Sequence, residues 1–346
     1  MKKKLAFLFL VLFCISGFSQ KKQHTKKTGT NVPAKPVWER GARLSLFVGQ
    51  AGSKNWASGT DVFSVSANAF LNVYANRVRG KWFFNNSLVA SYGLINNDEY
   101  STIKNDDKID FFSTLGISLK KEPKLGLTAA FNFRSQFSNG YERDYLNQGI
   151  KRRTSGFFAP AYITIAPIGL SYHEKSLDLY VSPVGIRGVL VSNRPYSYAF
   201  QGGIIPDGLI NQKNPAKQER SVAEMYGVDP KRTIQYQVGP YISASYNKEI
   251  CKNVSYCGRI DLFSDFTHDN PGNIDIFWTN TFYLKVNNWL NAVYSLDVAY
   301  DDDIKKFGYF KNHAALQSKS ILGLGVSAHF VESKKDHKKT HGRMHK

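Results

Sequence analysis

Three polar residues in the second half of the chain have the types that a hydrolytic site uses. Ser264, His268 and Asp269 lie close in sequence, and Ser264 and His268 share one face of an extended chain because their positions have the same parity. Acyl-transfer enzymes combine a serine, a histidine and a carboxylate in this way. Ordinary residues at the edge of a loop explain the pattern equally well, and the sequence lacks G-x-S-x-G, a Walker loop and H-E-x-x-H. We therefore predict that the protein is not an enzyme and needs no cofactor.

Cysteines and histidines are the other residues with chemical potential. Cys251 and Cys257 flank the segment KNVSY, and an exported protein could join them in a disulfide. If a hairpin turns near Lys252–Asn253, however, the two do not face each other, so a bridge would need the turn to fold back. The histidines His24, His337, His341 and His345 lie in Lys-rich terminal segments, where we expect solvated side chains and no metal site.

The first residues predict export from the cytoplasm. Three lysines precede an apolar run from Leu5 to Ile15, and small residues follow at Gly17 and Ser19. This order is typical of a signal peptide cleaved after Ser19, because the apolar run is too short to span a membrane comfortably. We expect residues 1–19 to be the signal peptide.

The net charge of +19 is concentrated near the ends. Lys2 to Lys4 contribute +3, residues 20–42 contribute +5 and residues 331–346 contribute +4, which leaves +7 for residues 43–330. We expect a basic periplasmic linker over 20–42 and a flexible, His-containing tail over 331–346. Binding to anionic surfaces is the lesser alternative for both, and nothing indicates nucleic-acid binding.

The central region alternates between apolar and small or polar residues with a period of two. In SILGLGVSAHF, for example, Leu322, Leu324, Val326 and Ala328 lie on one face, and small or polar residues lie between them. This alternation predicts strands with a different environment on each face. The expected strands span 43–50, 62–76, 81–94, 107–120, 125–138, 155–171, 177–192, 233–247, 254–266, 274–286, 289–300 and 316–330.

Short and long connections alternate between these strands. RVRG, KEPK, HEKS, NKEICKN and NN are short, and the long polar ones include INNDEYSTIKND, NGYERDYLNQGIKRR, residues 193–232 and DDDIKKFGYFKNHAA. Five tryptophans lie at or near expected strand ends: Trp38, Trp56, Trp82, Trp278 and Trp289. A soluble β-sandwich would alternate too, but it needs neither this rhythm nor aromatic girdles. We therefore predict an all-β, up-and-down transmembrane barrel of about twelve strands over 43–330, with short periplasmic turns and long extracellular loops.

The barrel would lie in the outer membrane with both termini in the periplasm. Its expected partners are outer-membrane lipid and the barrel insertion machinery. An aromatic residue that ends the last strand resembles the assembly signal of such barrels, which gives this role to Phe330, although sixteen residues follow it.

Parity predicts a polar group inside the barrel. Arg259, Asp261, Thr279, Asp297 and Lys319 fall on the inward faces of the last four strands, with Gly239 and Tyr241 beside them. Hairpin centres near residue 270 and at Asn287–Asn288 would set Asp261 opposite Thr279, Thr279 opposite Asp297, and Asp297 near Lys319. Two bases and two acids at one level predict a compensated network that fills a narrow lumen, or a constriction that selects ions or a small solute.

The sequence also resembles a known family. NWASG (55–59), YG (92–93), DDKIDFFSTLG (106–116), RSQFSNGY (134–141) and FFAPAY (157–162) are similar in order and spacing to the outer-membrane barrels of Bacteroidetes-type bacteria catalogued as domain of unknown function 3078. The resemblance covers roughly Trp38 to Phe330, with Thr60 in place of a frequent second glycine. It implies the fold and location but no mechanism.

Three classes of function follow. The first is a structural or surface-interacting barrel with a filled polar lumen, the second a narrow channel or small-solute transporter, and the third an outer-leaflet hydrolase. We predict the first. The surface ligand or solute is not indicated by any motif.

Overall fold

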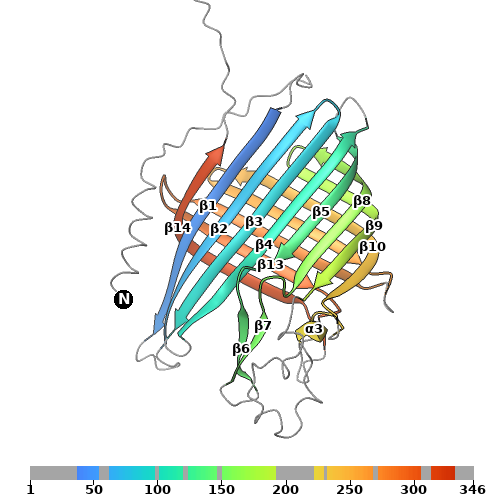
Figure 1. Ribbon diagram of the computed structural model, residues 1–346. Coiled ribbons are helices and arrows are strands. Elements are labelled where there is room, and N and C mark those ends of the chain that lie inside the picture. Colours follow the sequence, from blue (N-terminus) through green and yellow to red (C-terminus); the bar gives the residue numbers. More distant parts are fainter. Residues whose placement is uncertain are drawn as a thin grey trace, which may run out of the picture.

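The computed structural model describes residues 37–53, 62–97, 101–119, 124–145, 150–191, 222–229, 232–267, 272–304 and 313–331. In these residues, twelve antiparallel strands form one closed barrel (Figure 1). Its strands are β1 Val37–Ser53, β2 Val62–Arg79, β3 Trp82–Asn97, β4 Ser101–Ser118, β5 Leu125–Ser135, β8 Ala161–Glu174, β9 Leu177–Leu190, β10 Ile234–Cys251, β11 Val254–Ser264, β12 Ile274–Lys285, β13 Asn291–Tyr300 and β14 Gln317–Val331. The predicted fold class is confirmed.

Each strand of the barrel pairs with its neighbour in sequence, and the first and last strands close the ring. β1 pairs with β14 from Gly41↔Val331 to Val48↔Leu324. β5 pairs with β8 because the short strands β6 (Gly140–Tyr145) and β7 (Ile150–Ser155) form a separate hairpin in the connection between them. This hairpin and the short helix α3 (Val222–Met225) lie beyond the same end of the barrel, at which β9 ends and β10 begins (Figure 1); we call it the long-connection end.

The period-two alternation sorts side chains between the two faces of the wall. In β14, Leu322 is 70% exposed and Leu324 is 54% exposed on the outer face, whereas Gly323 between them is buried. Large apolar side chains cover the outside of the other strands in the same way, including Leu44, Val48, Val65, Leu115, Leu127, Ile165, Leu170, Val181, Ile186 and Val238. The outer surface is therefore apolar and the inner one polar, which is the opposite of a soluble barrel.

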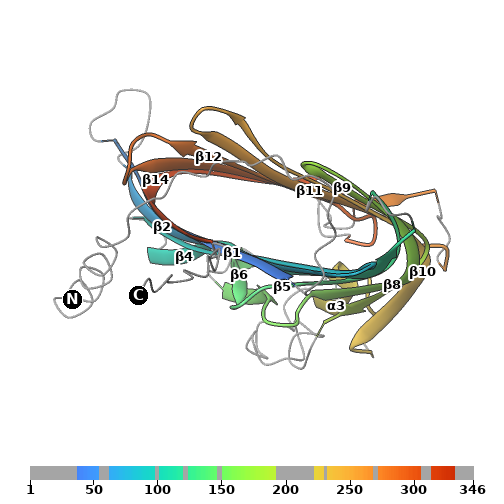
Figure 2. The ribbon, with the colours of Figure 1, turned by 90° about the horizontal axis from the view of Figure 1, so that it is seen from above.

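The barrel is flattened rather than round. Seen from above, its cross-section is elongated, with two broad walls that lie close together (Figure 2). Side chains from these walls fill the space between them. Phe47, Phe70 and Val293 form one buried cluster, and Tyr180, Tyr241 and Phe263 belong to another.

The ends of the predicted strands lie within four residues of the observed ones except at three places. The segment INNDEYSTIKND is not a long loop, because β3 continues to Asn97 and β4 begins at Ser101. β1 starts at Val37 rather than at 43 because it pairs with β2 as far as Val37↔Val78. In these places the ladder extends past the apolar band, where the sequence becomes polar on both faces and the alternation disappears.

The third difference is at the start of β8. Residues 155–160 are not part of it: Gly156 and Ala159 form an isolated bridge, and Pro160 has no amide hydrogen to donate to a ladder. Part of the predicted loop NGYERDYLNQGIKRR forms the β6–β7 hairpin.

Several predictions lie outside the described residues: the signal peptide at 1–19, most of the 20–42 linker, nearly all of the tail at 331–346, Trp56, His268 and Asp269. The described part of the chain contains no helix that is long and apolar enough to cross a membrane.

The seam between β14 and β1 depends on glycine. A Cβ atom on Gly325 would lie 1.8 Å from the carbonyl oxygen of Leu46, which is closer than any real contact. We predict that Gly325→Ala lowers the free energy of unfolding by about 1–3 kcal/mol, because the strands must separate to admit the methyl group. Urea unfolding of the refolded protein measures this, with Gly272→Ala as the control, since a Cβ there meets no atom within 4 Å. Equal stability of the two variants would contradict the close approach.

Candidate functional site

The five predicted interior residues all lie on inner faces of the barrel. Thr279 pairs with Asp297 and Asp297 pairs with Lys319, as the sequence predicts. The predicted pairing of Asp261 with Thr279 is wrong: Arg259 is the partner of Thr279. The centre of the β11–β12 hairpin lies one residue before 270, and such a displacement moves every partner by two positions.

The centre of the interior holds two arginines and two aspartates. Arg259 and Asp261 project from β11, and Arg134 of β5 and Asp110 of β4 project from the opposite wall. Arg134 Nε lies 3.1 Å from Asp110 Oδ2, and Arg259 Nε lies 2.9 Å from Asp261 Oδ2. The other two pairs, Arg134 with Asp261 and Arg259 with Asp110, join the two walls. Each carboxylate thus contacts both guanidinium groups, so the charges compensate one another.

Neutral donors complete this central cluster. Tyr241 Oη donates to Asp261 Oδ1 over 2.8 Å, and Asn132 Nδ2 donates to Asp110 Oδ1 over 2.9 Å. Both aspartates are buried, with 3% of each side chain exposed. Buried charges of this kind are tolerated only when paired and hydrogen-bonded, which is the case here.

A second group of ion pairs joins the same walls to one side of the centre. Lys108 Nζ of β4 lies 2.9 Å from Asp297 Oδ2 of β13, and Lys319 Nζ of β14 lies 3.2 Å from the same oxygen. Lys319 also pairs with Asp106 of β4. Together with the central cluster, these contacts connect β4 and β5 to β11, β13 and β14 across the lumen.

Aromatic rings pack against the arginines. The Arg259 guanidinium lies 5.0 Å from the ring centre of Phe112, and that of Arg134 lies 4.7 Å from Phe277. These contacts fit cation–π interactions, which are stronger away from water. Paired charges and aromatic rings therefore contact one another in the centre of the interior.

An acidic cluster lies toward the end of the barrel that carries the long connections. Arg187 of β9 pairs with Asp275 of β12, and its Nε donates to Gln237 Oε1 over 2.5 Å. Asp301 follows β13 and is 2% exposed. Burial raises the pKa of its carboxyl to about 7; Arg187 opposes this rise, and the carboxylates of Asp275 and Asp303 add to it.

The same end is covered by an apolar cap. Ala223 and Met225 of α3, together with Tyr226, Val228 and Ile304, pack on inner-face side chains of the wall in one buried cluster. Tyr162, Val189 and Phe277 provide those wall contacts. Gly227 adopts a φ of 71°, which lets the chain turn back after the helix.

Asp106, Lys108, Asp110, Arg134, Arg187 and Asp275 were not included in the interior group predicted from the sequence. A signal was present in DDKID, where Asp106, Lys108 and Asp110 alternate in phase with Thr114 and Gly116 of the same strand. Extending the parity rule from the last four strands to β4 and β5 would have found four of them. Which residues meet across the lumen depends on the flattening, and no local pattern encodes that.

The cysteines are not bridged. Cys251 pairs with Val254 and Cys257 pairs with Asn247, and both cysteines are free. The disulfide that the sequence left open does not form in this structure, since the tight turn at Lys252–Asn253 places the two cysteines at different levels of the ladder. Cys257 faces the interior, where Asn72 Nδ2 lies 3.7 Å from its Sγ, and Cys251 is exposed.

Two further predicted sites are only partly described. Ser264 is the last residue of β11 and is mostly buried, but its proposed companions His268 and Asp269 lie outside the described residues. Phe330 is 49% exposed near the end of β14 and pairs with Ala42. Its role in assembly stays a prediction.

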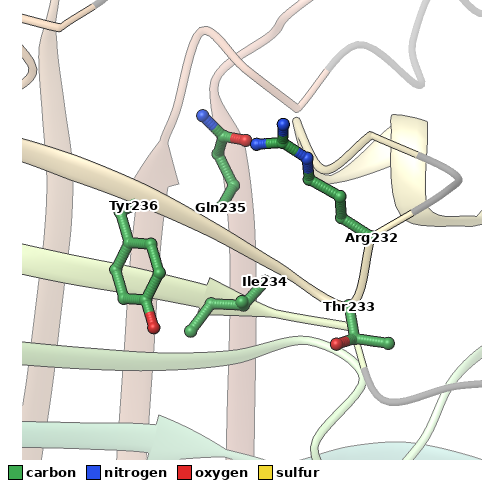
Figure 3. A pocket seen from close by; sticks show the side chains of 5 residues that line it. All are labelled: Arg232, Thr233, Ile234, Gln235 and Tyr236. Carbon is green, nitrogen blue, oxygen red and sulfur yellow. The ribbon is translucent and has the colours of Figure 1, made fainter.

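Two hollows border the described strands. One, of about 490 Å³, is lined by the sequence-adjacent residues Arg232 to Tyr236. Figure 3 shows the Gln235 amide and the Arg232 guanidinium pointing toward each other on one side of the strand, with Ile234 and Tyr236 on the other side. The other, of about 200 Å³, lies beside Asn105, Asp106 and Lys319, with Gln136 and Ser155 also in its lining.

The family model described as "Protein of unknown function (DUF3078)" matches residues 48–141. The predicted resemblance is confirmed. The matched segment runs from β1 to the β6 strand and includes the charged residues of β4 and Arg134. No curated protein matches the sequence.

Several solved structures resemble the chain at low identity. An outer-membrane channel from Pseudomonas putida F1 is 8% identical, with 89% of this chain and 100% of that chain covered and a TM-score of 0.34. The translocator domain of the autotransporter NalP from Neisseria meningitidis is 9% identical, with 94% and 95% covered and a TM-score of 0.33. The NanC porin is 11% identical, with 83% and 98% covered and a TM-score of 0.31.

The free thiols give a direct chemical test. We predict that the chain from Gln20 onward, purified without reductant, carries two thiols after denaturation, because neither cysteine forms a disulfide. In the folded protein, a bulky maleimide should label Cys251 and leave Cys257 unmodified, since only Cys251 is exposed. Mass spectrometry measures both, with Cys251→Ser as the control. A mass lower by two hydrogens, or labelling that persists in the control, would contradict the structure.

Proposed function

We propose that the protein is an outer-membrane barrel with a closed lumen, which acts in envelope organisation or surface interaction and does not conduct solutes. The observation that carries the proposal is the set of ion pairs between opposite walls, from Arg134, Arg259, Lys108 and Lys319 to four aspartates. A solute moving along the barrel would have to break these pairs. Separating buried charges costs several kcal/mol, so a static closed state is favoured.

The outer surface supports a membrane location. Its apolar band matches what lipid chains require, and aromatic side chains lie near both edges of the band. Trp82 and Trp289 are exposed at the end with short turns. At the other end, Tyr92 and Phe137 pack edge to face, with ring centres 6.5 Å apart. On this proposal the short turns lie in the periplasm, and lipid and the insertion machinery are partners.

The apolar cap supports closure independently of the ion pairs. Val228 is fully buried and Met225 is 4% exposed although both belong to the connection before β10. Tyr226 Oη donates to the carbonyl of Thr154 over 3.3 Å, which ties the cap to β7. The end with the long connections is therefore built as a packed surface rather than an open mouth.

This end also provides the surface for interaction. The β6–β7 hairpin projects past the barrel (Figure 1) and pairs with no other described strand. Its own register shifts between Gly140 and Tyr141 and between Glu142 and Tyr145. Projecting hairpins and long loops on a rigid barrel are where binding residues are commonly found. The partner's chemistry is not indicated by the described residues.

A narrow channel is the second candidate. The hollow of about 200 Å³ beside Lys319 supports it, because Asn105 Oδ1 and Asp106 Oδ2 beside the hollow are buried without hydrogen-bond partners. Such oxygens are usually satisfied by water, and connected water would provide a path for a small solute along β4.

Removing the cations separates the two candidates. We predict that the wild type shows no single-channel conductance in planar bilayers, and that Arg259→Ala, Lys319→Ala and the double variant stay closed while losing stability. Arg259→Ala should cost about 3–5 kcal/mol, because it leaves two buried aspartates to share Arg134. Lys319→Ala should cost less, since 36% of the Lys319 side chain is exposed and Lys108 still pairs with Asp297.

The control is Lys124→Ala, which breaks the exposed Lys124–Glu174 pair and should change neither quantity measurably. Conductance by the wild type, or a change in ion selectivity at unchanged stability in either interior variant, would make the protein a channel and overturn the proposal.

A further inference from the structure

Three carboxylates meet at the long-connection end of the barrel, one from the start of β12 and two from the turn after β13. Asp275 lies one residue inside β12, and Asp301 and Asp302 directly follow β13. The pairing Ile276↔Tyr300 brings these segments side by side. As a result, one carboxylate oxygen from each of the three aspartates lies within 4.8 Å of the other two. The cluster is not a surface feature, because Asp275 is 3% exposed and Asp301 is 2% exposed.

The negative charge of this cluster exceeds the positive charge that contacts it in the described part of the chain. Arg187 pairs with Asp275, and no other ion pair to the three aspartates occurs among the described residues. Asp303 adds a fourth carboxylate nearby, whose Oδ2 accepts a hydrogen bond of 2.6 Å from Gln237 Nε2. The central cluster, by contrast, sets two guanidinium groups against two carboxylates.

A separate observation indicates that a ligand completes the cluster. Asp275 Oδ1 is fully buried and has no hydrogen-bond partner, while Oδ2 of the same carboxylate pairs with Arg187. Leaving a buried carboxylate oxygen unsatisfied is costly, and native structures rarely do so without an ion or water in place. The oxygen belongs to a member of the cluster that is only 3% exposed.

The donors define the class of ligand. All three are carboxylates, which hard divalent cations prefer, and the cluster contains no sulfur or imidazole donor that would favour zinc or copper. Calcium accepts irregular sets of oxygen ligands and waters more readily than magnesium, which requires near-ideal octahedral geometry. We propose that Asp275, Asp301 and Asp302 bind one calcium ion at this end of the barrel.

The position of this site gives the ion a structural role. The backbone N–H of Asp303 donates to Asp301 Oδ1 over 3.0 Å, and that of Ile304 donates to the Asp301 carbonyl over 3.2 Å. Ile304 is part of the apolar cap formed with α3. A calcium ion would therefore fasten the turn after β13 to the start of β12 and hold the cap in place. The inference does not depend on whether the lumen conducts.

Calcium titration of the refolded full chain in detergent, free of lipopolysaccharide, tests the site. We expect one calcium ion per chain with a Kd of about 10⁻⁴–10⁻³ M, the range of extracellular calcium modules, and a melting temperature about 5 °C or more higher at saturating calcium than in EDTA. Magnesium at equal concentration should raise it much less. Asp301→Asn and Asp302→Asn should each weaken calcium binding at least about tenfold, because each removes a charged ligand.

Two features keep the result interpretable. In EDTA, Asp301→Asn should be at least as stable as the wild type, because it removes charge from a like-charged cluster; a well-folded variant without a calcium response is then expected. Glu249→Gln, an exposed substitution at the other end of β10, should retain the full response. The proposal would be overturned if calcium binding were not saturable, or if magnesium gave an equal response. It would also be overturned if the single variants Asp301→Asn and Asp302→Asn both kept the wild-type calcium response.

Discussion

The barrel interior is governed by the cost of placing ionised side chains away from water. Twelve strands enclose little space once side chains fill it, and the observed ring is further flattened (Figure 2). Charged groups on one wall then lie within reach of the other, and each must find a counter-charge. Asp110 and Asp261 meet this requirement by sharing Arg134 and Arg259 across the gap. The flattened shape and the cross-lumen ion pairs therefore depend on each other, since a rounder barrel would leave each wall with only its own pair.

The cost of burying charge also explains the other surfaces of the barrel. The outer surface carries apolar residues because its surroundings are apolar, and the interior is polar but compensated. Toward the long connections, the compensation changes. Asp301 and its neighbours carry more negative charge than Arg187 offsets, and an apolar cap that includes Val228 and Ile304 covers them. Among the described residues, this end therefore combines an apolar cap with an excess of acidic side chains, unlike the compensated centre.

The sequence was sufficient to predict the barrel because its signals are local. Alternation in SILGLGVSAHF identifies a strand and its faces from neighbouring residues alone, and hairpin geometry then sets Asp297 between Thr279 and Lys319. The predicted β11–β12 register was wrong because no sequence pattern between Ser264 and Ile274 marks the hairpin centre. A displacement of one residue made Arg259, rather than Asp261, the partner of Thr279. Contacts such as Lys108 with Asp297 join residues far apart in the chain and depend on the barrel's cross-section. No period or motif reports that shape, so the pairing of interior residues across the lumen could be found only in the structure.

The central claim is that opposite walls are energetically coupled through the lumen. A double-mutant cycle on Arg134 and Asp261, which lie on β5 and β11, tests it most directly, with Arg134→Gln, Asp261→Asn and the double variant compared by urea unfolding. The account predicts a coupling energy of at least about 1 kcal/mol, because the two groups contact each other across the gap. Additive effects within about 0.5 kcal/mol would mean that the walls do not interact through this pair, and would contradict a lumen closed by ion pairs.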